Sequence, residues 1–223
     1  MIHTSAPNVK ETPSFSVRQM EQRVVLNYVS IPGNSNKFYI MEFHEGSGEY
    51  SFCIYTEYGR LGRMPRKQKR FFQTRLHAKK EFDRILSSKR KKGYEMIVID
   101  EEWEELSLIP LRARYQSNVI HSNAQSPSIS NHTPLGNLSE IQLHRGMQIL
   151  TEIEEILHQG THDVIRLSNQ FYSVIPVVFG NQIDKSFLLD NSEKVKEKKE
   201  QLKQMILEGT RGQVPCPTKL FQF

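Results

Sequence analysis

The chain has 223 residues, of which 37% are hydrophobic and 25% are charged, and its formal net charge is +5. This composition excludes a wholly disordered chain, which would carry fewer large apolar residues, and the basic balance favours an anionic partner. Two widely separated cysteines exclude a disulfide framework and a zinc cluster, and they predict a reducing compartment. No apolar run is long enough to span a bilayer and no secretory signal is visible, so we expect a soluble intracellular protein.

The positive charge is concentrated in one segment of the chain. Between Asn36 and Glu95 the sequence holds 15 Lys and Arg residues but only 7 Asp and Glu residues. The remainder of the chain is slightly acidic by difference. This asymmetry makes the basic segment the first place in which to seek a functional site.

The N-terminal part predicts an arm followed by strands. Residues 1–22 are polar and contain two prolines, so we expect a flexible arm. Short extended runs follow, and they predict four strands over residues 24–29, 37–44, 49–57 and 66–73. Because side chains alternate along a strand, Phe38 should face away from Tyr39.

A helix is predicted directly after the fourth strand. Thr74 is the expected N-cap, and apolar residues recur at helical spacing up to a lysine-rich last turn that ends before Gly93. Residues 96–99 and 106–109 are further candidates for strands of the same sheet. The predicted fold class is α+β, with an antiparallel sheet and one packed helix forming a domain over residues 23–115.

The C-terminal part predicts helices only. Residues 116–134 are rich in Ser, Asn and Pro and predict a linker. Beyond them the apolar period changes to 3.6, and Ser139 with Gln142 predicts a capping box. We expect an all-α partial helical bundle over residues 135–212 and an irregular tail over 213–223. Its helices are predicted over residues 139–160, 163–172 and 192–209.

Two sets of residues carry a resemblance to a known family. The segment NKFYIMEFHEGSGEYSFCIYTEYGRLGR resembles the opening of a WGR domain, in which an aromatic-Gly-Arg turn follows a hairpin. Here that turn is Tyr58-Gly59-Arg60-Leu61-Gly62, with tyrosine in place of the usual tryptophan. The runs PLGNLS, LSNQFYSVIPVVFG and LLDN resemble the helical regulatory domain of poly(ADP-ribose) polymerases. Both modules in this order identify the chain as similar to that family.

The resemblance implies an NAD-dependent ADP-ribosyltransferase family, whose catalytic domain normally follows the helical one. Counterparts of the family's catalytic His, Tyr and Glu are missing here, so we expect no catalytic residue and an inactive chain when it is alone. No cofactor is expected on this chain, since NAD would belong to the missing domain. Further helices should follow Ile206 in the family, so we expect uncovered apolar faces on the helices that are present. The chain is either a fragment or a natural short form.

In the family, the aromatic residue of the turn packs against the exposed sugar at a DNA end and basic residues hold the terminal phosphates. The resemblance and the basic run together predict DNA-binding residues, namely Tyr58, Gly59, Arg63, Arg66, Lys67, Lys69 and Arg70. By resemblance, Arg60 would relay the DNA signal to the neighbouring domain. Because alternate positions of a strand share a face, Arg66 and Arg70 should point opposite to Lys67 and Lys69. Only a subset can then contact one phosphate backbone.

Tyr58 and the basic residues also have alternative interpretations. Tyr58 is equally consistent with a half-buried turn aromatic, and the basic run with a solvated edge strand that resists aggregation. The run of four basic residues over 89–92 is explained first by the dipole of a helix C-terminus, although a phosphate patch or a nuclear-localisation signal is compatible with it. None of the eight histidines has metal-ligand spacing, so no metal site is predicted.

We therefore expect the DNA-break-binding and allosteric regulatory part of a poly(ADP-ribose) polymerase that acts in the DNA damage response. Its expected partners are DNA ends or nicks and a catalytic or chromatin protein, its location is the nucleus, and no membrane is involved. The alternative is a non-catalytic adaptor that binds nucleic acid or acidic proteins non-specifically. Preference for broken DNA separates the two hypotheses, because a non-specific basic domain would bind intact and broken duplexes equally.

Overall fold

The computed structural model describes residues 13–97, 132–133, 135–159 and 163–212. The strands are β1 (Phe15–Ser30), β2 (Ser35–Gly48), β3 (Phe52–Arg60), β4 (Arg66–Phe72), β5 (Glu95–Ile97), β6 (His132–Thr133) and β7 (Gly136–Asn137). The helices are α1 (Arg75–Lys91), α3 (Glu140–Gln159), α4 (Val164–Val174), the 3-10 turn η2 (Lys185–Phe187) and α5 (Ser192–Gly212).

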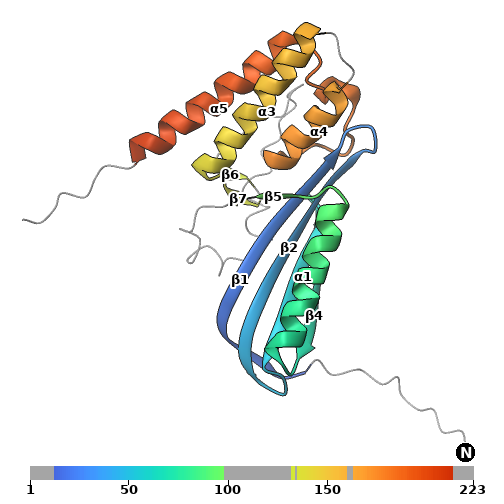
Figure 1. Ribbon diagram of the computed structural model, residues 1–223, viewed down its shortest axis with the longest axis vertical. Coiled ribbons are helices and arrows are strands. Elements are labelled where there is room, and N and C mark those ends of the chain that lie inside the picture. Colours follow the sequence, from blue (N-terminus) through green and yellow to red (C-terminus); the bar gives the residue numbers. More distant parts are fainter. Residues whose placement is uncertain (1–12, 98–131, 134, 160–162, 213–223) are drawn as a thin grey trace, which may run out of the picture.

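A five-stranded antiparallel sheet forms the N-terminal half. Its strand order is β4-β3-β2-β1-β5, and α1 lies lengthwise on one face (Figure 1). Tyr39, Met41 and Phe43 point toward α1, where they join a core that includes Phe82. Phe38 belongs to a different core on the opposite face, so the predicted alternation is confirmed. The predicted α+β class with one helix packed on a sheet is confirmed as well.

The ends of α1 follow from local chemistry. The Thr74 hydroxyl accepts a hydrogen bond from the His77 backbone N–H at 3.4 Å, so Thr74 is the predicted N-cap. Gly93 has a φ of 82°, a left-handed conformation that suits glycine and ends the helix. The chain then returns to the sheet as β5, as predicted for residues near 96, whereas 106–109 lie outside the described residues.

The prediction of a flexible arm over residues 1–22 is wrong for its C-terminal part. Strand β1 begins at Phe15 and pairs with β2 as far as Gly48. Two register shifts interrupt the alternation of side chains along β1. Because the hydrogen bonds between strands use backbone atoms, polar residues can form this strand without the apolar pattern that would predict it. The Phe15 ring lies so close to Gly46 that a Cβ there would overlap it. Gly46 and Gly48 both lie in β2, and the turn to β3 follows at residues 49–51.

Helices α3, α4 and α5 gather at the end of the sheet where the β1–β2 turn lies (Figure 1). They share one apolar core with the sheet face opposite α1. That core joins sheet residues such as Val29, Phe38 and Ile40 to helical residues such as Ile153 and Phe171. The two halves of the chain are therefore continuous in their packing, although their sequence patterns differ.

Polar contacts reinforce this junction where β1 extends beyond β5. The Val29 N–H donates to Ser173 Oγ at 2.8 Å, and the Ile31 N–H donates to Asn169 Oδ1 at 2.8 Å. Side chains of α4 thus accept hydrogen bonds from backbone N–H groups at the end of β1, which β5 does not reach. The buried Asn36 amide also donates to the Val177 carbonyl at 2.9 Å. Separation of the helices from the sheet would leave these groups without their partners.

The start of α3 contains Ser139 and Gln142, the two residues of the predicted capping box. Ser139 Oγ accepts a hydrogen bond from the Gln142 backbone N–H at 3.3 Å, as expected for an N-cap. The Gln142 side chain donates to the Val174 carbonyl at 2.6 Å and so joins α3 to the end of α4. The Gln142 side chain therefore takes part in the docking of α3 against α4.

The three helices bury most of their apolar surface. Among their described residues, the large exposed apolar side chains are Ile141, Ile165 and Leu207. The expected uncovered faces are therefore much reduced, because the sheet supplies the packing surface. None of the described helices is both long and apolar enough to cross a bilayer.

Gly62→Ala is expected to destabilise the fold by about 1–3 kcal/mol, the usual cost of a non-glycine residue in a left-handed conformation. Gly62 has a φ of 84°, and a Cβ there would lie 2.8 Å from Val178 Cγ1 in the helical half. Urea unfolding measures the change. Gly59→Ala is the matched control, because its φ is not positive and its new Cβ would be 3.5 Å from the nearest atom. Equal stabilities of the two variants would contradict this account.

Candidate nucleic-acid interface

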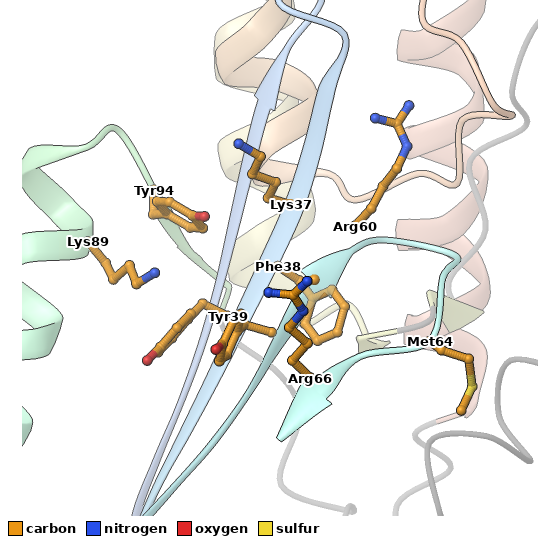
Figure 2. A pocket seen from close by; sticks show the side chains of 10 residues that line it. Lys37, Phe38, Tyr39, Arg60, Met64, Arg66, Lys89 and Tyr94 are labelled. Atoms are coloured by element: carbon orange, nitrogen blue, oxygen red, sulfur yellow. The ribbon is translucent and has the colours of Figure 1, made fainter. Parts of the chain in front are cut away.

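A pocket of about 460 Å³ opens where β2, β3 and β4 meet the end of α1 (Figure 2). Its charged lining residues are all basic: Lys37, Arg60, Arg66 and Lys89. Tyr39, Tyr58 and Tyr94 provide an aromatic wall. Cations around aromatic rings can accept an anion together with a flat, uncharged group. The lining therefore suits a phosphate that is attached to a sugar or base.

Tyr58 lies within strand β3, so its predicted position in a turn is wrong. It pairs with Tyr39 on one side and with Arg66 on the other. The rings of Tyr58 and Tyr39 are stacked, with centroids 5.3 Å apart and planes inclined by 20°. Tyr58 is half-buried, and the turn itself follows at residues 61–65. This stacking places the Tyr58 ring at the wall of the pocket.

Lys89 lines the pocket, although the sequence analysis explained it first by the helix dipole and did not include it among the DNA-binding residues. Its Nζ lies 3.7 Å from the centroid of the Tyr39 ring, 5.2 Å from Tyr94 and 6.0 Å from Tyr58. Burial lowers the pKa of Lys89, and the nearby charges of Lys92 and Lys37 lower it further. The signal was available, because Lys89 follows Ile85 by four residues and continues the buried stripe of α1.

The basic run on β4 divides between the two faces of the sheet, as predicted. Arg66 lines the pocket, and Arg70 shares its face but donates to Glu81 of α1 at 2.7 Å. Lys67 lies on the opposite face, where its Nζ is 3.6 Å from Glu57. Lys69 occupies the same face as Lys67 and is exposed. Of these four residues, only Arg66 lines the pocket.

Arg60 and Arg63 are turned toward the helical half. The Arg60 guanidinium donates to the Asn34 carbonyl at 2.6 Å and to Asn181 O at 3.4 Å. Arg63 donates to the side chain of Asn181. Arg60 therefore lies between the pocket and the loop after α4, whereas Arg63, also predicted to bind DNA, does not line the pocket. Gly59 lines the pocket beside Arg60.

Buried polar groups on the far face of the sheet do not form a metal site. Glu57 is buried, and desolvation raises its pKa, although Lys67 opposes the shift. Tyr55 donates to Glu57 at 3.3 Å. Within the described residues, no group of three or more His, Cys, Asp or Glu side chains could hold a metal ion.

Two family models match separate segments of the chain. The family described as "WGR domain" matches residues 22–100, and "Poly(ADP-ribose) polymerase, regulatory domain" matches residues 115–207. The chain is similar to poly(ADP-ribose) polymerases over these two segments. The WGR match contains the whole pocket, and the regulatory match contains α3, α4 and most of α5.

Individual relatives are similar at a low level of identity. Poly [ADP-ribose] polymerase 2-A of Oryza sativa subsp. japonica is 25% identical over 88% of this chain and 34% of its own length. Human protein mono-ADP-ribosyltransferase PARP3 is 26% identical over 70% of this chain and 37% of its own length. Human poly [ADP-ribose] polymerase 2 is 26% identical over 70% of this chain and 34% of its own length. The chain spans about a third of the length of these curated relatives.

Proposed function

We propose that this chain is the DNA-break-binding and allosteric regulatory part of a poly(ADP-ribose) polymerase that acts in the nucleus in the DNA damage response. The observation that carries the proposal is the pocket of the WGR domain, in which basic side chains surround a tyrosine wall. A catalytic or chromatin protein is the expected second partner. ADP-ribose transfer and NAD binding are assigned to a transferase domain and to no residue of this pocket.

The chemistry of the pocket favours a broken strand over a continuous one. A break exposes a terminal phosphate and the sugar face of the last nucleotide, which an intact duplex hides. The terminal phosphate would lie between Arg66 and Lys89, since charge-assisted bonds to phosphate are short and strong. Tyr58 would cover the terminal nucleotide, and stacking on an aromatic residue contributes about 1–3 kcal/mol per base in single-strand systems.

The regulatory part of the proposal rests on the junction with the helices. Arg60 lines the pocket and also donates to Asn181 in the regulatory domain. Occupation of the pocket can therefore change contacts in the helical half without any long chain of intermediates. Such coupling requires that DNA binds two arrangements of this junction with different affinities.

The test is a fluorescence-anisotropy titration with two duplexes at several salt concentrations. One duplex carries a 5′-phosphorylated nick and hairpin-closed ends, and the other is continuous with closed ends. We expect tighter binding to the nick, and we expect Tyr58→Ala to reduce the preference. Equal binding to both duplexes would overturn the proposal and favour a non-specific basic adaptor.

Binding should also weaken at alkaline pH because of Lys89. The pKa of Lys89 is lowered from the ordinary lysine value of 10.5. Its ammonium group is charged at pH values well below this lowered pKa, and the charge is lost as the pH rises through it. Affinity for the nicked duplex should fall in the same range. Lys89→Arg keeps the charge at these pH values and should remove the fall. Identical pH profiles for both proteins would contradict the assignment.

A further inference from the structure

Asn34 has an unusual backbone conformation at a position that joins three segments. It closes the turn between β1 and β2, where its N–H donates to the Ile31 carbonyl at 3.1 Å. Its φ is 44°, and among the described residues it is the one non-glycine residue with a positive φ. Asparagine tolerates this region better than most residues, but glycine would adopt it more easily. The side chain of Asn34 therefore needs an explanation beyond the turn.

That side chain and its own carbonyl receive donors from two other segments. Asn34 Oδ1 accepts hydrogen bonds from Arg60 Nη2 at 3.0 Å and from the backbone N–H of Ile183 at 3.0 Å. The Asn34 backbone carbonyl accepts from Arg60 Nη1 at 2.6 Å. One residue thus joins the β1–β2 turn, the end of β3 and the loop between α4 and η2. Ile183 is buried in the core that the sheet shares with the helices.

Arg60 cannot serve the pocket and Asn34 in the same orientation. Arg60 lines the pocket, but its guanidinium points away from Tyr39 and Lys89 (Figure 2). The five N–H donors of a guanidinium lie in one rigid plane, so a turn toward a phosphate withdraws them from their present acceptors. A phosphate carries a negative charge, whereas the two acceptors on Asn34 are neutral, so a phosphate in the pocket attracts the guanidinium more strongly. An anion in the pocket therefore competes with Asn34 for Arg60.

We propose that Asn34 is the positioning residue that couples occupation of the pocket to docking of the regulatory domain, an inference that rests on the proposed function. With the pocket empty, Asn34 holds both Arg60 and Ile183. With a DNA phosphate in the pocket, Arg60 leaves, Asn34 loses the partner that fixes its amide plane, and the bond to Ile183 weakens. The loop that begins at Asn181 is then held less firmly against the sheet.

Two substitutions separate this role from simple turn formation. Asn34→Gly keeps the positive φ and the carbonyl that binds Arg60, but it removes Oδ1. Asn34→Asp keeps an acceptor for Ile183 and tolerates the same φ, while its negative charge holds Arg60 more tightly. If Asn34 only forms the turn, Asn34→Gly has no consequence at Ile183. If it is the positioning residue, the two variants change DNA affinity in opposite directions.

The experiment is hydrogen–deuterium exchange of peptides covering residues 181–185 in the full chain, without DNA and with the 5′-phosphorylated nicked duplex. Without DNA, we expect Asn34→Gly to raise exchange at the Ile183 amide about three- to tenfold, the loss of one hydrogen bond, and Asn34→Asp to leave it near the wild-type value. Addition of DNA should raise exchange in the wild type and add little in Asn34→Gly. DNA affinity should rise about threefold in Asn34→Gly and fall in Asn34→Asp.

Unchanged exchange in Asn34→Gly without DNA would overturn the role of Asn34 whatever the DNA does. An equal DNA-induced increase in the wild type and Asn34→Gly would overturn the coupling, even though DNA binds. Failure of the chain to prefer the nicked duplex would overturn the proposed function and the coupling, and the DNA-free comparison would still decide the docking role. The two hypotheses thus fail by different measurements.

Discussion

Arg66→Ala is expected to lower the affinity for a 5′-phosphorylated nicked duplex by about 10- to 100-fold, the value of one charge-assisted hydrogen bond to phosphate. Lys67→Ala should lower it by less than about twofold. The two residues are adjacent in sequence and both are basic, but they lie on opposite faces of β4. Arg66 lines the tyrosine pocket, whereas Lys67 is 3.6 Å from the buried carboxylate of Glu57. Anisotropy titrations at constant salt measure both effects.

This pair of variants removes the same net charge, so a loss of general electrostatic attraction would affect both equally. The salt dependence gives a second measure, because loss of one phosphate contact reduces the slope of log K against log salt by about one. Arg70→Ala is a further control, since its guanidinium already binds Glu81 on the pocket face. Equal losses for Arg66→Ala and Lys67→Ala would locate DNA binding elsewhere on the basic surface.

Periodicity explains why the central sheet and α1 could be predicted from the sequence. Strand alternation placed Phe38 and Tyr39 on opposite faces, and a threonine cap with a terminal glycine bounded the helix. The start of β1 escaped prediction because bulges disrupt the alternation and its residues are mostly polar. Local pattern detects a strand only where one of its faces is buried, and β1 is largely exposed over its first residues.

The candidate site was predicted only in part, for a different physical reason. Tyr58 and Arg66 could be proposed from the family motif and the basic run, and the structure brings both to one pocket. Lys89 was assigned first to the helix dipole. Its spacing from Ile85 predicts the buried face of α1 but not the side chains that it meets there. Its contact with three tyrosines depends on the tertiary position of α1. Lys37 was missed likewise, since a single lysine on a strand is ordinarily solvated.

The junction between the halves was the least predictable feature. A serine- and asparagine-rich linker predicted two separate domains, but the apolar surface of each half is completed by the other. The polar links use Asn169, Ser173 and Asn36, residue types that are common in loops and surfaces and carry no local signal of docking. Their acceptors and donors are more than 130 positions away in the sequence. Only the folded arrangement reveals that these polar side chains are structural.

Phe171→Ala is expected to destabilise the sheet as well as the helices, by about 3–5 kcal/mol, the usual cost of removing a buried phenylalanine side chain. Phe171 lies on α4 with no exposed surface, in the core that also contains Val29 and Phe38. A loss of this size lowers the melting temperature of a domain of about 200 residues by about 6–20 °C. Because the core is continuous, unfolding should remain a single transition when followed by calorimetry.

Exchange protection in β2 distinguishes a shared core from two independent domains. In a cooperative unit, Phe171→Ala reduces protection of the central β2 amides by the same free energy as in α4, since both exchange through global unfolding. Ile141→Ala is the control, because this side chain of α3 is 70% exposed and its loss should change stability by less than about 0.5 kcal/mol. If β2 kept its full protection in Phe171→Ala, the helices would be a separate folding unit. Under the proposed function, the helical half would then signal across an interface that can open, whereas in a single unit DNA binding would have to shift the packing of the core itself.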